Sequence, residues 1–98
     1  MPNFSNSFMG NACEKKLTKE ELIRTIRFSI AAEFEAIQLY EQIAESTTNT
    51  KAIKILKEVA DDEKVHVGNL YKLLEILSPD EIEHYKDGIN ETCEILSE

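Results

Sequence analysis

The sequence has little of what breaks a chain into short elements, with three glycines and two prolines in 98 residues. This scarcity argues against many short strands and tight turns and favours a few long elements. No apolar run approaches the ~20 residues that a membrane-spanning helix requires. Residues 1–11 show no basic cluster followed by an apolar segment. We therefore expect no secretory signal, no membrane partner and a cytoplasmic location.

Cysteines and basic residues are also few. Cys13 and Cys93 lie near opposite ends of the chain and form no CxxC pair, which argues against a zinc knuckle or a thioredoxin-type site. Two isolated thiols fit a reducing compartment, and we expect both to be chemically inert. Eleven Lys and Arg against nineteen Asp and Glu give a formal charge of -8. This balance argues against a nucleic-acid partner and allows a cation as partner.

The sharpest local pattern marks the start of a long helix. Residues 1–16 are rich in Asn and Ser without periodicity, so we expect a flexible leader followed by one domain over residues 17–98. Thr18 and Glu21 have the spacing of a capping box, and Leu17 with Leu22 has that of a hydrophobic staple. A helix should therefore begin near residue 19 and continue to about residue 45.

Two more helices are expected after a short polar connector at residues 46–50. The second should cover about residues 50–77 and pair with the first as an antiparallel hairpin. Ser78 as cap, Pro79 at the first position and Glu81 completing a capping box should start a third helix over about residues 79–96, which Gly88 weakens. The fold class is all-α, and the apolar side of the third helix comprises Ile82, Tyr85, Ile89, Cys93 and Leu96.

Ionisable residues interrupt the apolar rows of both long helices. Glu33 and Glu35 each stand in an apolar row of the first helix, and Glu63 and His66 complete such a row in the second. A buried carboxylate costs several kcal/mol unless it is paired or binds a metal. Carboxylates combined with an imidazole form a mixed oxygen and nitrogen set that suits iron or manganese. These positions therefore predict a metal site.

The chain supplies only half of a two-metal site. In four-helix bundles that hold two metals, each metal takes a Glu from one helix and a Glu-x-x-His motif from another. Glu33 with Glu63 and His66 makes one such set. Two chains related by a two-fold axis would complete the site and form a four-helix bundle. The first helix is apolar on more than one face, which independently indicates an oligomer.

These residues resemble a known signature. Glu33 and Tyr40, followed by Asp62-Glu63-Lys64-Val65-His66, resemble the iron-binding motif of the ferritin and rubrerythrin superfamily, and the local run around Glu33 is most similar to the encapsulated ferritin family. The resemblance covers about residues 17–77. It implies a ferroxidase that oxidises Fe(II) to Fe(III) with dioxygen for iron storage or detoxification. It also implies a di-iron centre at a dimer interface, a ring-shaped homodecamer and enclosure in an encapsulin nanocompartment.

The resemblance also implies roles for individual residues. By position, Glu33, Glu63 and His66 are iron ligands, and Glu63 bridges the two metals. Tyr40 is a hydrogen-bond partner beside the ligands, and Glu35 belongs to a weaker cation site on the entry path. Two features of the sequence depart from the family pattern. Ala32 stands where some members carry another acid. Residues 91–98 show no clear shell-targeting peptide.

Two alternatives remain open from the sequence. One is a di-iron protein of rubrerythrin type that consumes peroxide or oxygen. The other is a non-enzymatic helical association module whose acids and histidine form a polar network that sets partner register. Tyr40 is equally consistent with core packing, and Glu35 with an interface salt bridge. We expect Asp61, Asp62 and His84 on the surface.

Overall fold

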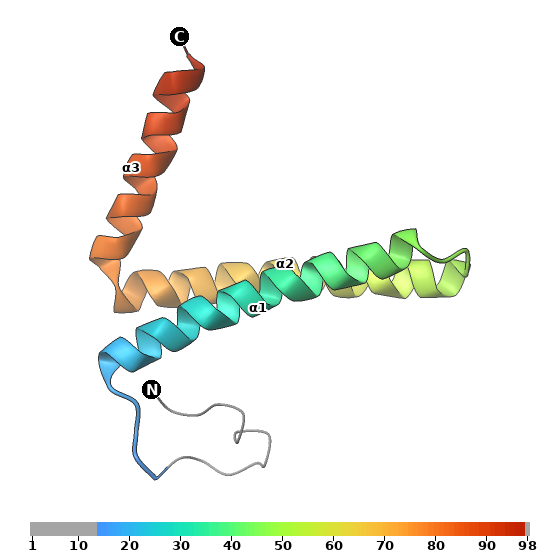
Figure 1. Cartoon of the computed structure of the whole chain (residues 1–98), viewed down its shortest axis with the longest axis horizontal. Coiled ribbons are helices and arrows are strands. Elements are labelled where there is room, and N and C mark those ends of the chain that lie inside the picture. The colour runs from blue at the N-terminus through green and yellow to red at the C-terminus, as the bar shows by residue number, and fades with distance from the viewer. Residues whose placement is uncertain (1–13, 98) are drawn as a thin grey trace.

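Three helices account for nearly all of residues 14–97, which are the residues that the computed structural model describes (Figure 1). Helix α1 spans Lys19–Glu45, α2 spans Thr50–Leu77 and α3 spans Pro79–Leu96. No strand occurs in this part of the chain. The all-α class and the three expected helix ranges are confirmed. The first thirteen residues of the expected leader, including Cys13, lie outside the described residues.

Helices α1 and α2 lie side by side as an antiparallel hairpin (Figure 1). The predicted capping box starts α1, because the Thr18 hydroxyl accepts from the Glu21 N–H at 3.1 Å and the Glu21 carboxylate accepts from the Thr18 N–H at 2.9 Å. The hydrogen bond from the Thr18 backbone lowers the pKa of Glu21. Asn49 caps α2 by accepting from the Ala52 N–H at 3.0 Å. Hydrogen bonds from nearby side chains therefore determine where α1 and α2 begin.

The start of α3 differs from the prediction. Ser78 is the N-cap and Pro79 follows it, but the Ser78 hydroxyl donates to the Glu81 carboxylate at 3.1 Å and caps no backbone N–H. Glu81 is turned instead toward Arg27 on α1, which donates two hydrogen bonds to it. The predicted capping box at Ser78 is therefore wrong, because a charged partner from another helix takes the carboxylate. Helix α3 also continues through Gly88 without a break.

The core sits where the three helices meet. Ile26 of α1, Leu74 of α2 and Ile82 of α3 are buried against one another, and partly buried aliphatic residues surround them. Beyond this root, α3 stands away from the hairpin (Figure 1). Of its expected apolar side, Ile82 is buried, whereas Tyr85, Ile89, Cys93 and Leu96 are exposed.

Large apolar side chains remain exposed on every helix of the single chain. A soluble monomer rarely leaves so many uncovered, so this exposure indicates protein interfaces. None of the helices in the described part of the chain is long and apolar enough to span a membrane. The most exposed examples are Phe28, Phe34, Ile55, Val65, Ile76, Ile89, Ile95 and Leu96.

Candidate metal centre

Glu33 from α1 meets Glu63 and His66 from α2 near the middle of the hairpin. One ligand atom of each residue lies within 4.8 Å of the others. Among residues 14–97, these three side chains form the cluster whose geometry could hold a metal ion. Residues three apart on a helix project to the same side, which places Glu63 beside His66. The antiparallel pairing of α1 and α2 then supplies Glu33. The three predicted ligands are thus brought together.

The contacts within this trio are long. His66 Nδ1 lies 3.4 Å from Glu63 Oε2 and 3.8 Å from Glu33 Oε2. Nitrogen-to-oxygen hydrogen bonds are typically about 2.7–3.2 Å long. The trio is therefore not closed by hydrogen bonds among its own members, and the three groups keep their lone pairs for another partner.

The trio is partly buried and opens toward solvent at the histidine. The exposed fraction of the side chain is 25% for Glu33, 19% for Glu63 and 53% for His66. Glu33 Oε2 is buried and has no hydrogen-bond partner within the described chain. An unsatisfied buried polar atom costs about 1–3 kcal/mol, and more when it is charged. A cation bound at this point would remove that cost.

The donor chemistry fits iron. Two carboxylates and one imidazole match the mixed oxygen and nitrogen sets that iron and manganese accept, and no thiol is present in the trio. Three side chains on one chain leave coordination positions open, and the half-exposed His66 lies at the open edge.

The other two predicted site residues lie outside this trio. Tyr40 is half-buried on α1, seven positions after Glu33 and therefore on the same side of the helix. Glu35 is exposed and lines a shallow hollow of about 390 Å³ on the surface of α1 together with Ala32 and Leu39. The roles expected for Tyr40 and Glu35 stay predictions.

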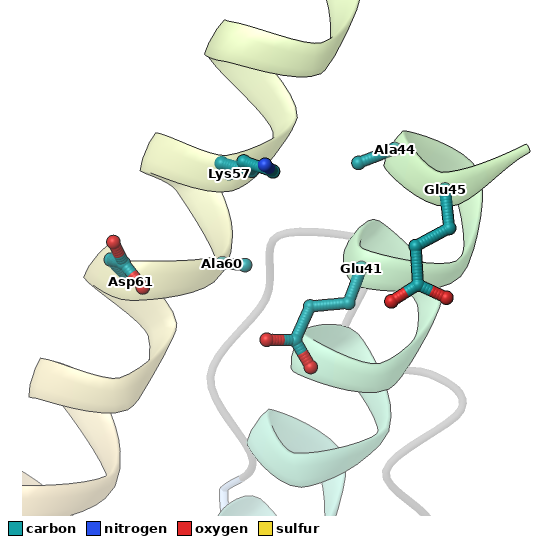
Figure 2. Close-up of a pocket in the computed structure, with 6 residues that line it drawn as sticks. All are labelled: Glu41, Ala44, Glu45, Lys57, Ala60 and Asp61. Atoms are coloured by element: carbon teal, nitrogen blue, oxygen red, sulfur yellow. The ribbon is translucent and has the colours of Figure 1, made fainter. Parts of the chain in front are cut away.

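Acidic side chains also line a second hollow near the hairpin loop, but lysine side chains lie close to them. Figure 2 shows Glu41 and Glu45 of α1 on one side, with Lys57 and Asp61 of α2 on the other. Lys64 donates to Glu41 at 3.3 Å and to Asp61 at 3.2 Å, and the Asp61 contact is the main cause of its raised pKa. Lys64 therefore already compensates the carboxylates of Glu41 and Asp61.

The expected surface residues behave as predicted. Asp61 and Asp62, next to the trio in sequence, are exposed, and His84 is exposed on α3. Sequence reasoning missed two ion pairs between helices, namely Lys64 with Glu41 near the trio and Arg27 with Glu81 at the root of α3. The partners are 23 and 54 positions apart, and no local pattern connects residues so distant.

The fold and the trio together define a class, a helical hairpin protein with a cluster of two carboxylates and a histidine that could hold a metal ion. The family model described as Rubrerythrin matches residues 25–97. The chain therefore belongs to the rubrerythrin family of ferritin-like proteins.

Two relatives show which members of this family the chain resembles. The chain is 43% identical, over 84% of its length, to a "Ferritin-like-encapsulin shell fusion protein" of Pyrococcus furiosus. It is 37% identical, over 76% of its length, to "Encapsulin nanocompartment cargo protein EncC" of Myxococcus xanthus. The chain spans 24% of the length of the first protein and 58% of the second.

A solved structure agrees with this placement. The crystal structure of the encapsulated ferritin domain from Pyrococcus furiosus is similar with a TM-score of 0.83 and 40% sequence identity. The similarity covers 90% of this chain and 90% of that one. The expected likeness to encapsulated ferritins is confirmed.

Proposed function

We propose that this protein is a ferroxidase whose di-iron site forms where two chains meet across a two-fold axis. The observation that carries the proposal is the trio of Glu33, Glu63 and His66, with an open edge at His66. Glu33 Oε2 is buried and has no hydrogen-bond partner in the described part of the chain. Each chain contributes one Glu and one Glu-x-x-His motif, so two chains supply the full set. The two hairpins would together make a ferritin-like four-helix bundle.

Iron is the substrate in this proposal. Two Fe(II) ions each give up one electron, and dioxygen accepts both electrons together with two protons to leave as hydrogen peroxide. The carboxylates of Glu33 and Glu63 are anionic oxygen donors, which stabilise the more highly charged Fe(III) product. His66 would supply a nitrogen donor, and Glu63 would bridge the two ions. Tyr40 would orient a ligand from the same face of α1, and exposed Glu35 would attract Fe(II).

The proposed setting follows from the relatives. Their names join a ferritin-like domain to an encapsulin shell or describe a cargo of the encapsulin nanocompartment. We place this chain in the same setting, as a ring-shaped decamer enclosed by an encapsulin shell in the cytoplasm. A shell would supply the storage volume that an 11.2 kDa chain lacks.

The match to the rubrerythrin family also supports a second candidate function. A rubrerythrin-type protein uses the same carboxylate and histidine donors to reduce peroxide or oxygen. The two candidates differ in their preferred oxidant, so the initial rate of Fe(II) oxidation should be compared under dioxygen and under anaerobic peroxide. A ferroxidase prefers dioxygen, and a large preference for peroxide would favour the alternative.

The activity test is an aerobic Fe(II) titration followed by absorbance of the Fe(III) product. Glu63→Ala and His66→Ala should reduce the oxidation rate to that of buffer. Glu58→Ala and His84→Ala are matched controls, because both side chains are exposed and lie outside the trio. Wild-type oxidation at the buffer rate would reject the enzyme and leave the association module.

Native mass spectrometry with metal analysis tests the shared site. We expect an even number of chains and one tightly bound iron per chain. A monomer that retains full iron binding would contradict a site built from two chains.

A further inference from the structure

Lys64 joins the two helices that carry the metal trio. Its ammonium group donates to Glu41 Oε2 on α1 at 3.3 Å and to Asp61 Oδ1 on its own helix at 3.2 Å. Among residues 14–97, the contact with Glu41 is the one polar side-chain contact between α1 and α2 outside the trio. Lys64 directly follows Glu63 in the chain, so this link between the helices starts at the level of the trio.

Lys64 leaves α2 on the side that faces away from the open edge of the trio. Successive residues of an α-helix are rotated by about 100°, so Lys64 lies on one side of Glu63 and His66, three residues on, lies on the other. Helical side chains also incline toward the N-terminus of their helix, which for α2 is the end at the hairpin loop. Lys64 therefore extends from the trio toward the loop, and a change of Lys64 leaves the open edge at His66 untouched.

The hairpin has little buried contact on the loop side of the trio. In the described part of the chain, the buried residues there are two alanines, Ala44 of α1 and Ala60 of α2. A hollow of about 220 Å³ lies beside them, lined by both helices (Figure 2). The larger buried cluster around Leu74 lies on the other side of the trio. The ion pair of Lys64 with Glu41 therefore joins the helices where apolar packing is weakest.

The trio itself pushes the two helices apart before iron binds. A carboxylate oxygen of Glu33 lies within 4.8 Å of one of Glu63, and the two residues belong to different helices. Like charges at this separation repel each other, more strongly where they are partly buried. A cation that reaches from α2 to α1 beside the trio opposes this repulsion, because it attracts α1 toward α2.

We propose that Lys64 is a positioning residue that holds the trio together before iron binds. The inference rests on the proposed ferroxidase function, because it assigns Lys64 a part in the same site. The ammonium group does not contact iron and acts through Glu41, which fixes α1 and with it Glu33. Once iron is bound, the ligands themselves join the two helices. Lys64 therefore contributes to the binding of Fe(II) and not to its oxidation.

Electrostatic attraction alone predicts the opposite effect, so the sign of the change tests the proposal. Removal of a positive charge near a cation site should strengthen Fe(II) binding. Loss of the link between the helices should weaken it, because iron must then bring α1 and α2 together as it binds. Both partners are about half exposed, and such ion pairs contribute modestly. We expect Lys64→Met to raise the Kd for Fe(II) by roughly 2–5-fold.

Anaerobic isothermal titration calorimetry with Fe(II) measures this Kd in the full-length protein without turnover. Lys64→Met removes the charge and keeps a long unbranched side chain. Lys57→Met is the matched control, because Lys57 lines the same hollow but forms no ion pair within residues 14–97. We expect Lys57→Met to bind Fe(II) as tightly as wild type or slightly more tightly. Lys64→Arg keeps the charge and should restore the wild-type Kd, with one iron per chain in all four proteins.

Changes of the two carboxylates locate the effect. Glu41→Gln breaks the link between the helices and should weaken Fe(II) binding as much as Lys64→Met does. The double variant should be no weaker than either single variant, because both remove the same interaction. Asp61→Asn removes the same charge from the same hollow but breaks a contact within α2, so its Kd should stay close to that of wild type.

Two further measurements distinguish positioning from a general loss of stability. In aerobic oxidation, Lys64→Met should raise the KM for Fe(II) and leave kcat unchanged. In the metal-free protein, amide hydrogen exchange of residues 33–41 should be faster in Lys64→Met than in wild type and unchanged in Lys57→Met. The exchange measurement needs no iron and therefore tests the link between the helices by itself.

The outcomes separate this inference from the proposed function. Lys64→Met that binds Fe(II) at least as tightly as wild type, or that binds a second iron per chain, would overturn the positioning role and leave the ferroxidase proposal intact. Equal weakening by Lys57→Met or Asp61→Asn would overturn it too, because the effect would then follow charge alone. A lower kcat at unchanged KM would contradict a role in binding. Wild-type protein that binds no Fe(II) would instead reject the iron site and the inference together.

Discussion

Glu33 and His66 meet across the contact between α1 and α2, with 3.8 Å separating Glu33 Oε2 from His66 Nδ1. The distance is too long for a hydrogen bond, although the carboxylate oxygen is buried and has no other partner in the described chain. Without a cation this arrangement costs stability. Such a cost is typical of a binding site that is formed before its ligand arrives.

Replacing Glu33 should therefore raise the stability of the metal-free protein and abolish its activity. Glu33→Leu extends the apolar row of α1 and removes a buried carboxylate, so the metal-free protein should gain about 1 kcal/mol, or roughly 4–8 °C in Tm. Oxidation of Fe(II) should fall to the buffer rate. Thermal unfolding with a chelator present and the Fe(II) titration measure the two effects.

Glu58→Leu is the matched control for this variant, because Glu58 is an exposed acid of α2 outside the trio. It should change neither the oxidation rate nor the Tm appreciably. A metal-free Glu33→Leu protein that is clearly less stable than wild type would show that Glu33 has a structural role instead.

Tyr40→Phe should slow the reaction without emptying the site. The phenyl ring keeps the packing of the half-buried side chain, and only the hydroxyl that is proposed to orient a ligand is lost. Groups that orient metal ligands commonly change affinity or activity by ~10–100-fold, and we expect about 10-fold in rate with one iron per chain retained. Tyr71→Phe, beside Tyr85 and outside the trio, should leave the rate unchanged. Equal oxidation rates for wild type, Tyr40→Phe and Tyr71→Phe would show that Tyr40 has only a packing role.

Glu81 gives the protein a predictable dependence on pH. The hydrogen bonds from Arg27 lower the pKa of Glu81 from 4.5 to about 2. Above pH 4.5 the carboxylate is charged in both the folded and the unfolded protein, so its stabilisation is fully present. As the pH falls from 4.5 toward 2, the unfolded chain takes up the proton first, and the stabilisation declines.

The comparison of wild type with Glu81→Gln measures this effect. Arg27 is half-exposed, so the contribution should be about 1 kcal/mol at neutral pH. The difference in Tm between the two proteins should shrink progressively below pH 4.5. Glu83→Gln on the same helix removes an exposed pair with Lys86 and should show a much smaller difference at neutral pH. A Glu81→Gln difference that does not vary between neutral pH and pH 3 would contradict the assignment.

The capping box of α1 should contribute measurably to stability. Thr18→Ala removes the acceptor for the Glu21 N–H, and N-cap substitutions of this kind cost about 1 kcal/mol. Chemical unfolding at neutral pH would measure the loss. Thr50→Ala is the control, because Thr50 is the first residue of α2 and Asn49 provides the cap there. Equal stability of Thr18→Ala and wild type would mean that solvent replaces the cap.

The helix limits and the trio could be predicted because both depend on short-range geometry. Thr18 with Glu21 and Asn49 mark helix starts through side chains that reach only three residues along the chain. Glu63 and His66 were recognisable because helical periodicity places both in an apolar row, and Glu33 interrupts the facing row.

The role of Glu81 could not be predicted in the same way. Its spacing from Ser78 is that of a capping box, but Arg27 lies 54 positions away and binds the carboxylate more strongly than a backbone N–H would. The apolar hollow where the three helices meet was equally unpredictable, since its lining residues Phe34, Tyr71 and Tyr85 come from three helices and share no periodic pattern.

The sequence by itself determined the three helices, the faces they present and the residues of the candidate metal site, because helix geometry relates near neighbours. Only the tertiary structure decided that Glu33 Oε2 is buried without a partner among residues 14–97, that Arg27 binds Glu81 at the root of α3, and that α3 stands clear of the hairpin. These features depend on how helices approach one another. That approach is set by packing around Ile26, Leu74 and Ile82, which lie far apart in the chain.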